Sequence, residues 1–260
     1  MRFLSIIMLS AASLFAAADL TPAQAEEIIQ KFTANESEFA KARESYTYRQ
    51  TARIQALDNA GNVVGRWEEV ADIVFDKGGK RGERVVRAPV STLGNYIGLT
   101  PEDLKDIRST QPFVLTSANL PDYFVRYLGP ETLDEIECYA FAVKPKKLVP
   151  GERYFSGIVW VDTRDVQVVK TYGRGVGIAK NQAFPKFETF RQQIDGRYWF
   201  PVYTIAEDTL HFESGQDQRI RQIVRYDDYK QFRSSTTITF GDVLEDTPEP
   251  PKPPATPAKP

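Results

Sequence analysis

The side chains that most often carry catalysis are scarce in this sequence. It holds one histidine, His211, and one cysteine, Cys138, both in strand-like runs. A single histidine cannot build a His-rich zinc site, and no histidine lies near Cys138 in sequence to activate its thiol. We expect His211 to be a solvated or packed strand residue and Cys138 to be a small buried core residue. No catalytic residue, metal ligand or cofactor is predicted, and we expect a protein that is not an enzyme.

Two other polar patterns could carry chemistry. Carboxylates cluster at Asp134-Glu135-Glu137, Glu207-Asp208 and Asp227-Asp228, and such runs in β-rich chains are usually turns and solvated faces. Gly173, Gly175 and Gly177 form GRGVG, which resembles a fragment of a phosphate-binding loop. No helix with a suitable N-terminus follows it, so we expect an ordinary mobile loop.

Large apolar side chains remain, and the three tryptophans Trp67, Trp160 and Trp199 lie on three separate predicted strands. Six are candidates for an apolar pocket: Trp67, Phe75, Trp160, Val168, Trp199 and Tyr203. The functional interpretation is a concave site for an acyl chain. The competing interpretation is an ordinary packed core, because a lipid-lined cavity and a core use the same residue types.

The segment Tyr154–Lys170 shows why the choice between a ligand site and a packed core matters. Its two β-rich runs flank a short polar connection at residues 162–165, and both faces of the predicted hairpin are apolar. A hairpin of this kind belongs in a sheet that is covered on both sides. Helices, another sheet or a ligand must therefore fill the second side.

A long amphipathic helix is predicted after Thr21-Pro22, where threonine is the N-cap and proline the first helical residue. One stripe recurs at three- and four-residue steps and is apolar apart from its asparagine: Ala25, Ile28, Phe32, Asn35, Phe39, Ala42 and Tyr46. The opposite, polar face carries Gln30, Lys31, Glu36, Glu38, Lys41 and Arg43. Such a helix must dock on the β structure that follows.

Alternating apolar residues predict about eleven strands. Three come first, at about 46–56, 63–76 and 81–88, and the segment Pro89–Pro121 then forms an excursion with a second helix start at Thr100-Pro101. Eight more strands follow: Tyr123–Leu128, Ile136–Lys144, Tyr154–Asp162, Val166–Tyr172, Phe187–Ile194, Tyr198–Asp208, Arg219–Tyr229 and Thr236–Phe240. Asp195-Gly196 predicts a tight hairpin, and Pro201 marks an edge strand or a bulge. The predicted fold is α+β and mainly β: a strongly curved antiparallel sheet, an incomplete β-barrel, wrapped around the N-terminal helix and the helical excursion.

The two ends of the chain predict export and a tail. Residues 1–18 have a basic start at Arg2, a short apolar run and an Ala16-Ala17-Ala18 cleavage site, which together indicate a signal peptide. No cysteine follows the cleavage site, so we expect an unlipidated periplasmic protein with no transmembrane segment in its mature form. Residues 245–260 are rich in proline and should be a disordered tail.

The formal charge argues against some partners. It is −2 for the whole chain, and losing Arg2 with the signal peptide makes it −3. This near-neutral total gives no electrostatic case for nucleic acid or for an anionic membrane surface.

Two passages and the order of the elements resemble the LolA-like family, which includes outer-membrane lipoprotein-sorting proteins and periplasmic lipid carriers. The first passage runs from Tyr127-Leu128-Gly129-Pro130-Glu131 through Cys138-Tyr139-Ala140-Phe141 to Lys144-Pro145-Lys146. The second is the hairpin that begins Gly157-Ile158-Val159-Trp160-Val161-Asp162. Together they cover about 50 residues of the chain.

The resemblance implies a half-barrel domain over residues 19–244, with helices as lids over an apolar cavity. It implies a periplasmic carrier or sensor whose partner is the acyl chain of a lipid or lipoprotein. The carriers close their lid with an arginine, and Arg49 and Arg53 on the first strand are candidates. The alternative is a non-enzymatic cell-envelope module with a filled core that binds another protein. Nucleic acid is not an expected partner.

Overall fold

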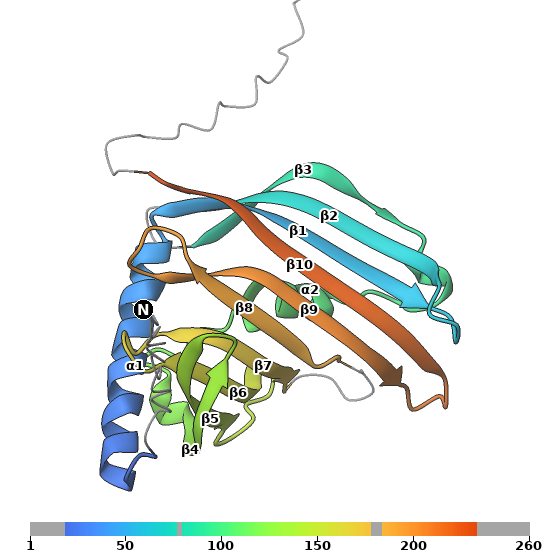
Figure 1. Ribbon diagram of the computed structural model, residues 1–260. Helices are drawn as coiled ribbons and strands as arrows, with labels where there is room; N and C mark the ends of the chain where they lie inside the picture. The colour runs from blue at the N-terminus through green and yellow to red at the C-terminus, as the bar shows by residue number, and fades with distance from the viewer. Residues whose placement is uncertain (1–18, 77–79, 178–183, 233–260) are drawn as a thin grey trace, which may run out of the picture.

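Ten antiparallel strands form one sheet in the computed structural model, which describes residues 19–76, 80–177 and 184–232. The spatial order is β3-β2-β1-β10-β9-β8-β7-β6-β5-β4. The strands are β1 (Tyr46–Leu57), β2 (Val63–Phe75), β3 (Arg81–Ser91), β4 (Tyr123–Leu133), β5 (Ile136–Pro145), β6 (Tyr154–Asp162), β7 (Val168–Val176), β8 (Phe187–Gln193), β9 (Trp199–His211) and β10 (Asp217–Gln231). The sheet curves strongly and does not close, since β3 and β4 remain as edges (Figure 1).

This architecture confirms the predicted fold class. The sheet is an open, mainly β half-barrel with few helices, and the strands predicted in the described segments are all present. The predicted strand Thr236–Phe240, the signal peptide at residues 1–18 and the Pro-rich tail at 245–260 lie outside the described residues.

The N-terminal helix α1 (Pro22–Arg43) begins where the sequence predicts. The Thr21 hydroxyl and the Gln24 side chain form a reciprocal capping box, which satisfies the free N–H groups of the first turn. The buried residues of α1 are Ala25, Ile29, Phe32, Thr33, Glu36 and Phe39. The prediction was wrong in two places: Glu36 lies on the buried face rather than the polar face, and Tyr46 belongs to β1.

The excursion, residues 92–122, connects β3 to β4 and contains short helical turns. These are η1 (Leu93–Asn95), α2 (Pro101–Lys105), the π-helical turn η2 (Asp106–Thr110) and η3 (Leu120–Asp122). Thr100 caps α2 through a second reciprocal box with Asp103, as the sequence predicts. Figure 1 shows α1 beside the β4–β8 half of the sheet and α2 inside the curve.

We call the face toward α1 and the excursion the inner face. Under the excursion, one buried apolar cluster covers the β1, β2 and β10 part of that face: Tyr48, Ala52, Ile54, Ala56, Trp67, Ala71, Ile73, Leu93, Ile107, Val224 and Tyr226. Under α1, a second covers the β5–β9 part: Ile29, Phe32, Leu115, Tyr123, Phe141, Val143, Phe155, Val159, Val161, Val168, Phe187 and Ala206. The helix α1 and the excursion are called the covers from here on. Side chains of both covers are therefore part of the core.

The opposite, outer face carries a smaller apolar cluster around Trp160. It contains Cys138, Ala140 and Val169, with Trp199 and others packed at its margin. The Trp160 indole Nε1 donates a hydrogen bond to Glu131 at 2.7 Å, which satisfies the one polar atom of the ring. The two apolar faces of the β6–β7 hairpin thus have different neighbours, with the covers on the inner side and this outer cluster on the other.

Several local predictions can be compared with the structure. Cys138 is buried, as predicted, and burial together with nearby carboxylates raises the pKa of its thiol to about 12, so the thiol stays protonated. Most residues of the GRGVG stretch lie in β7, so it is not the mobile loop that the sequence predicts. Pro201 lies in an interior strand, opposite Arg191 at an irregularity in strand register, which fits a bulge and not an edge. His211 is exposed and lies 2.8 Å from Asp217.

Candidate functional site

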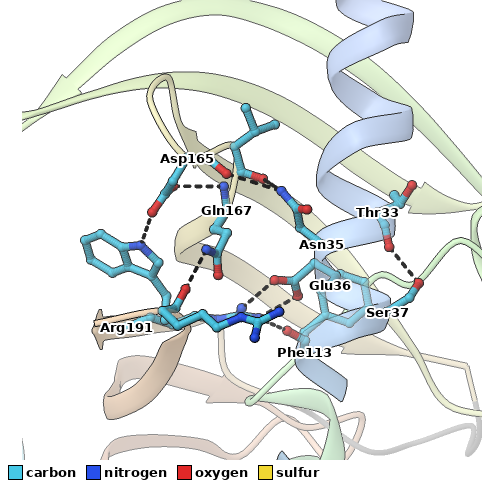
Figure 2. Close-up of polar contacts among 11 residues, drawn as sticks. Thr33, Asn35, Glu36, Ser37, Phe113, Asp165, Gln167 and Arg191 are labelled. Atoms are coloured by element: carbon cyan, nitrogen blue, oxygen red, sulfur yellow. Dashed lines mark hydrogen bonds and ion pairs between the residues drawn. The ribbon is translucent and has the colours of Figure 1, made fainter. Parts of the chain in front are cut away.

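A buried ion pair ties α1 to the inner face of the sheet. Arg191 on β8 donates from Nη1 to Glu36 Oε1 at 2.8 Å and from Nη2 to Oε2 at 3.1 Å (Figure 2). The same guanidinium also donates to the Phe113 carbonyl of the excursion. Both charged side chains are at most 2% exposed. One arginine therefore holds both covers.

The electrostatics of this pair favour positioning over net stability. Burial raises the pKa of the Glu36 carboxyl, and the Arg191 guanidinium, which favours the ionised form, opposes that effect. A raised pKa for an acid means that its charge costs the folded state free energy at neutral pH. The pair fixes the place of α1, while most of the net stabilisation comes from the apolar contacts around it.

Asn35 attaches the same helix to the turn between β6 and β7. Its Nδ2 donates to the Asp165 carbonyl at 3.2 Å and to the Val166 carbonyl at 2.9 Å (Figure 2). Val166 has a φ of 55°, a left-handed conformation that is costly for a β-branched residue. Asn35 and Glu36 thus give the helix two neighbouring polar contacts with the sheet.

A second buried ion pair ties the excursion to the loop before β6. Arg153 Nε donates to Asp106 Oδ1 at 2.6 Å, Nη2 contacts Oδ2, and Nη1 donates to the Gly177 carbonyl at 2.7 Å. A Cβ on Gly175 would lie 2.4 Å from this guanidinium. The glycines of GRGVG therefore leave room for a buried arginine, which is a structural role.

A cleft of about 160 Å³ lies between the excursion and strands β1, β9 and β10. It is lined by Ile54, Ile97, Gly98, Leu99, Thr100, Asp103, Pro185, Leu210, Phe212, Ile220 and Gln222. The Gln222 side chain is only 5% exposed, and its Nε2 has no hydrogen-bond partner. A buried unpaired donor costs about 1–3 kcal/mol, so a ligand that supplies an acceptor would gain from it.

The six residues predicted from the sequence do not line one pocket. Trp67 and Phe75 belong to the inner cluster under the excursion, and Val168 belongs to the inner cluster under α1. Trp160 and Trp199 lie in the outer cluster, while the Tyr203 ring lies 6.4 Å from that of Phe190. None of the six lines the inner cleft.

The arginines that hold the covers also differ from those considered in the sequence. Arg49 and Arg53 form surface ion pairs with Asp72 and Glu68 on the neighbouring strand. Arg153 and Arg191 form the buried ion pairs with the excursion and with α1. Glu36 had one signal in the sequence: it continues the three- and four-residue spacing of Phe32 and Phe39 on α1, where a charge is unusual unless paired. Gln222 had a similar signal, because it continues the two-residue alternation of Ile220 and Val224 on β10, whereas no comparable signal marks Asp106.

Neither a metal centre nor a membrane-spanning helix is found among the described residues. No group of three or more His, Cys, Asp and Glu side chains there could hold a metal ion. Of the helices in that part of the chain, none is both long and apolar enough to cross a bilayer.

Comparison with known proteins gives structural likenesses alone. No family model and no curated protein matches the sequence. A LolA superfamily protein from Nitrosomonas europaea is similar at TM-score 0.36 and 14% identity, over 80% of this chain and 94% of that one. An outer-membrane lipoprotein-sorting protein domain from Vibrio parahaemolyticus, described as putative, follows at TM-score 0.34 and 10% identity, over 78% and 93%. MucB is similar at TM-score 0.27 and 12% identity, over 78% and 93%.

The first of these structures is named as a LolA superfamily protein and the second as a lipoprotein-sorting domain. Their TM-scores are all below 0.5, so they carry no argument about what this chain binds. The chain is thus similar to LolA superfamily proteins, and its function has to be argued from its own geometry.

Proposed function

We propose that this protein is a non-enzymatic, periplasmic carrier or sensor that takes the acyl chain of a lipid or lipoprotein between the inner face and its covers. The cleft beside the excursion is the entry point. The observation that carries the proposal is the unpaired Gln222 amide in a mainly apolar cleft. A fatty acyl group matches that combination, because it presents a carbonyl acceptor at the end of an apolar chain.

The size of the cleft requires the excursion to move. A volume of about 160 Å³ is close to that of a cavity which holds one benzene molecule, whereas pockets for larger ligands measure roughly 300–1,000 Å³. An acyl chain that lifts the excursion replaces apolar contacts with other apolar contacts, so little hydrophobic stabilisation is lost. The Asp106–Arg153 ion pair defines the position to which the excursion returns when the ligand leaves.

A second candidate is an envelope protein-interaction module with a filled core. Complete burial of Phe32, Phe141 and Ile73, each 0% exposed, favours it, because side chains already occupy much of the inner face. Native mass spectrometry of the purified protein, followed by lipid extraction, separates the two candidates. A retained lipid, or saturable binding of a fluorescent fatty acid, supports the carrier. If the folded protein shows neither result, the interaction module is the better account.

Filling the cleft is expected to block uptake. A Cβ added at Gly98 meets nothing within 4 Å, and the residue lines the cleft, so Gly98→Leu should place apolar bulk where the ligand enters. We expect binding of a fluorescent fatty acid to weaken by at least about 10-fold, which is about 1.4 kcal/mol. Gly94→Leu is the matched control, since its Cβ is equally free but it does not line the cleft. Equal binding by the two variants would place the ligand elsewhere.

Removing the unpaired donor should separate binding from stability. Gln222→Leu eliminates a buried amide that lacks a partner, so the free energy of unfolding should stay constant or rise by about 1 kcal/mol. Affinity for a fatty acid should fall by about 10-fold, since a lost hydrogen bond is worth about that much. A hydrocarbon probe without a carbonyl should bind both proteins equally. A parallel loss for both ligands would show that Gln222 acts by shape alone.

A further inference from the structure

A long open groove crosses the outer face of strands β4 to β7. Its volume is about 940 Å³, and its apolar floor includes Phe124, Ala142, Ile158 and Tyr172. The strand register explains the arrangement: Ala142 pairs with Arg126 on one side and with Ile158 on the other, and Ile158 pairs with Tyr172. Paired residues lie on the same face of a sheet about 5 Å apart, so these side chains form one continuous surface.

The described charged residues that line this groove are all cationic. Arg126, Lys144, Arg174 and Lys186 line it, and no carboxylate does in the part of the chain that the structure describes. All four are exposed, and within the described residues none forms an ion pair. Elsewhere on the outer face basic residues have carboxylate partners, as where Arg49 and Arg84 both contact Asp72. The groove therefore carries a local positive charge that the chain's net charge of −2 conceals.

An apolar tip with more lysines adjoins the groove. The Nζ atoms of Lys144 and Lys146 each lie 5.6 Å from the centre of the Phe124 ring, which is 52% exposed. The loop of residues 146–153 continues from there through Lys147 to Leu148 and Val149, which are 53% and 43% exposed. Glu152 lies within this loop and Asp122 just before β4, but the lysines and arginines near the loop outnumber these two acids.

We infer that this surface, the basic patch, docks the protein on a bilayer that contains anionic phospholipid. Exposed apolar side chains on a loop tip, with lysines and arginines around them, suit the boundary between headgroups and acyl chains. Each basic residue near an anionic surface adds roughly 1 kcal/mol of attraction, so several together suffice for reversible binding. A bilayer fits better than an acidic peptide, because the apolar residues protrude from a loop and an open sheet face.

The inner cleft stays accessible in such an arrangement. The basic patch lies on the outer face of β4–β7, whereas the cleft lies inside the curve at β1, β9 and β10. Docking through the patch therefore leaves the proposed acyl site unblocked, and the two surfaces can be tested separately.

The test is co-sedimentation of the chain without its predicted signal peptide, residues 19–260, with vesicles of phosphatidylcholine, with and without about one third phosphatidylglycerol. The patch variant combines Lys144→Gln, Lys147→Gln, Leu148→Ser and Val149→Ser. The control variant combines Lys41→Gln on α1 and Ile194→Ser in the β8–β9 turn, which remove an exposed lysine and an exposed apolar residue elsewhere. We expect the wild type to bind only the anionic vesicles, with binding weakened by salt.

The patch variant should bind those vesicles at least about 50-fold more weakly, while the control variant binds like the wild type. The Gly98→Leu variant should also bind vesicles normally, which keeps a failure of the acyl site distinct from a failure of docking. Absence of vesicle binding by the wild type, or equal binding by patch and control variants, overturns the inference. Patch-dependent binding of poly-glutamate without vesicle binding would also overturn it and would indicate an acidic protein partner.

Discussion

Replacing Arg191 by leucine is expected to lower the free energy of unfolding by about 3–5 kcal/mol. The guanidinium is 1% exposed and is the ion-pair partner of the buried Glu36 carboxylate, so its removal leaves a charge without a partner away from water. It also leaves the Phe113 carbonyl without this donor. We therefore expect α1 and the excursion to loosen together.

Replacing both members of the pair should restore most of that loss. The double variant Glu36→Leu/Arg191→Leu buries two apolar side chains in place of two charges, an exchange that is often neutral or stabilising. Urea unfolding of the wild type, both single variants and the double variant gives the coupling energy directly. Additive single effects would contradict the interpretation of the pair as one unit.

Substituting Gly157 by alanine is expected to cost about 3 kcal/mol, at the upper end for overpacking. Gly157 and Gly173 pair across β6 and β7, and a Cβ on Gly157 would lie 2.1 Å from the Tyr172 carbonyl oxygen and 2.6 Å from the Gly173 Cα. Both are backbone atoms, so no rotamer change relieves the contact. The two strands would have to separate at the centre of the sheet.

Thermal or urea unfolding measures this cost, and Gly94→Ala provides the control. A Cβ on Gly94 meets nothing within 4 Å, so that variant should unfold within about 0.5 kcal/mol of the wild type. If Gly157→Ala were equally neutral, the close approach of β6 and β7 would not hold in solution.

Much of the fold could be predicted from local patterns. Thr21-Pro22 and Thr100-Pro101 each begin a helix, because capping chemistry depends on residues three positions apart. Asp195-Gly196 lies in the β8–β9 turn, and Gly196 has the positive φ of 77° that glycine accepts without strain. Strand alternation likewise depends on near neighbours, so the strands were found, although β4 extends to Leu133 where the prediction ended at Leu128 and β7 extends to Val176 where it ended at Tyr172.

The candidate site was not predictable in the same way, because its parts are far apart in sequence. Arg191 and Glu36 are separated by 155 positions. The spacing of Glu36 on α1 suggests a paired charge, but nothing in the sequence identifies Arg191 as its partner. The tryptophans misled for a related reason. Strand propensity places Trp67 and Trp160 on strands, but which face of the curved sheet each one meets depends on register across the whole sheet.

The basic patch illustrates the same limit for charge. The cations of its rim come from β4, β5, β7 and the residues before β8, and of these only Lys144 belongs to a run of like charges, Lys144-Pro145-Lys146-Lys147. Net charge averages over the molecule and does not reveal that these distant segments lie side by side. The patch exists because the antiparallel register brings these strands into one row.

The seam between β1 and β10 has a consequence for how the chain folds. It is the only strand pairing that joins β1–β3 to β4–β10 in the described sheet, and it aligns residues as distant in the chain as Tyr46 and Gln231. Every other neighbouring pair of strands is consecutive in sequence. The entropy of closing so long a loop makes this pairing slow, whereas the hairpins on either side can form early. A nascent chain that still lacks β10 consists of two separate meanders, so the half-barrel becomes one sheet only after nearly all of the polypeptide is available.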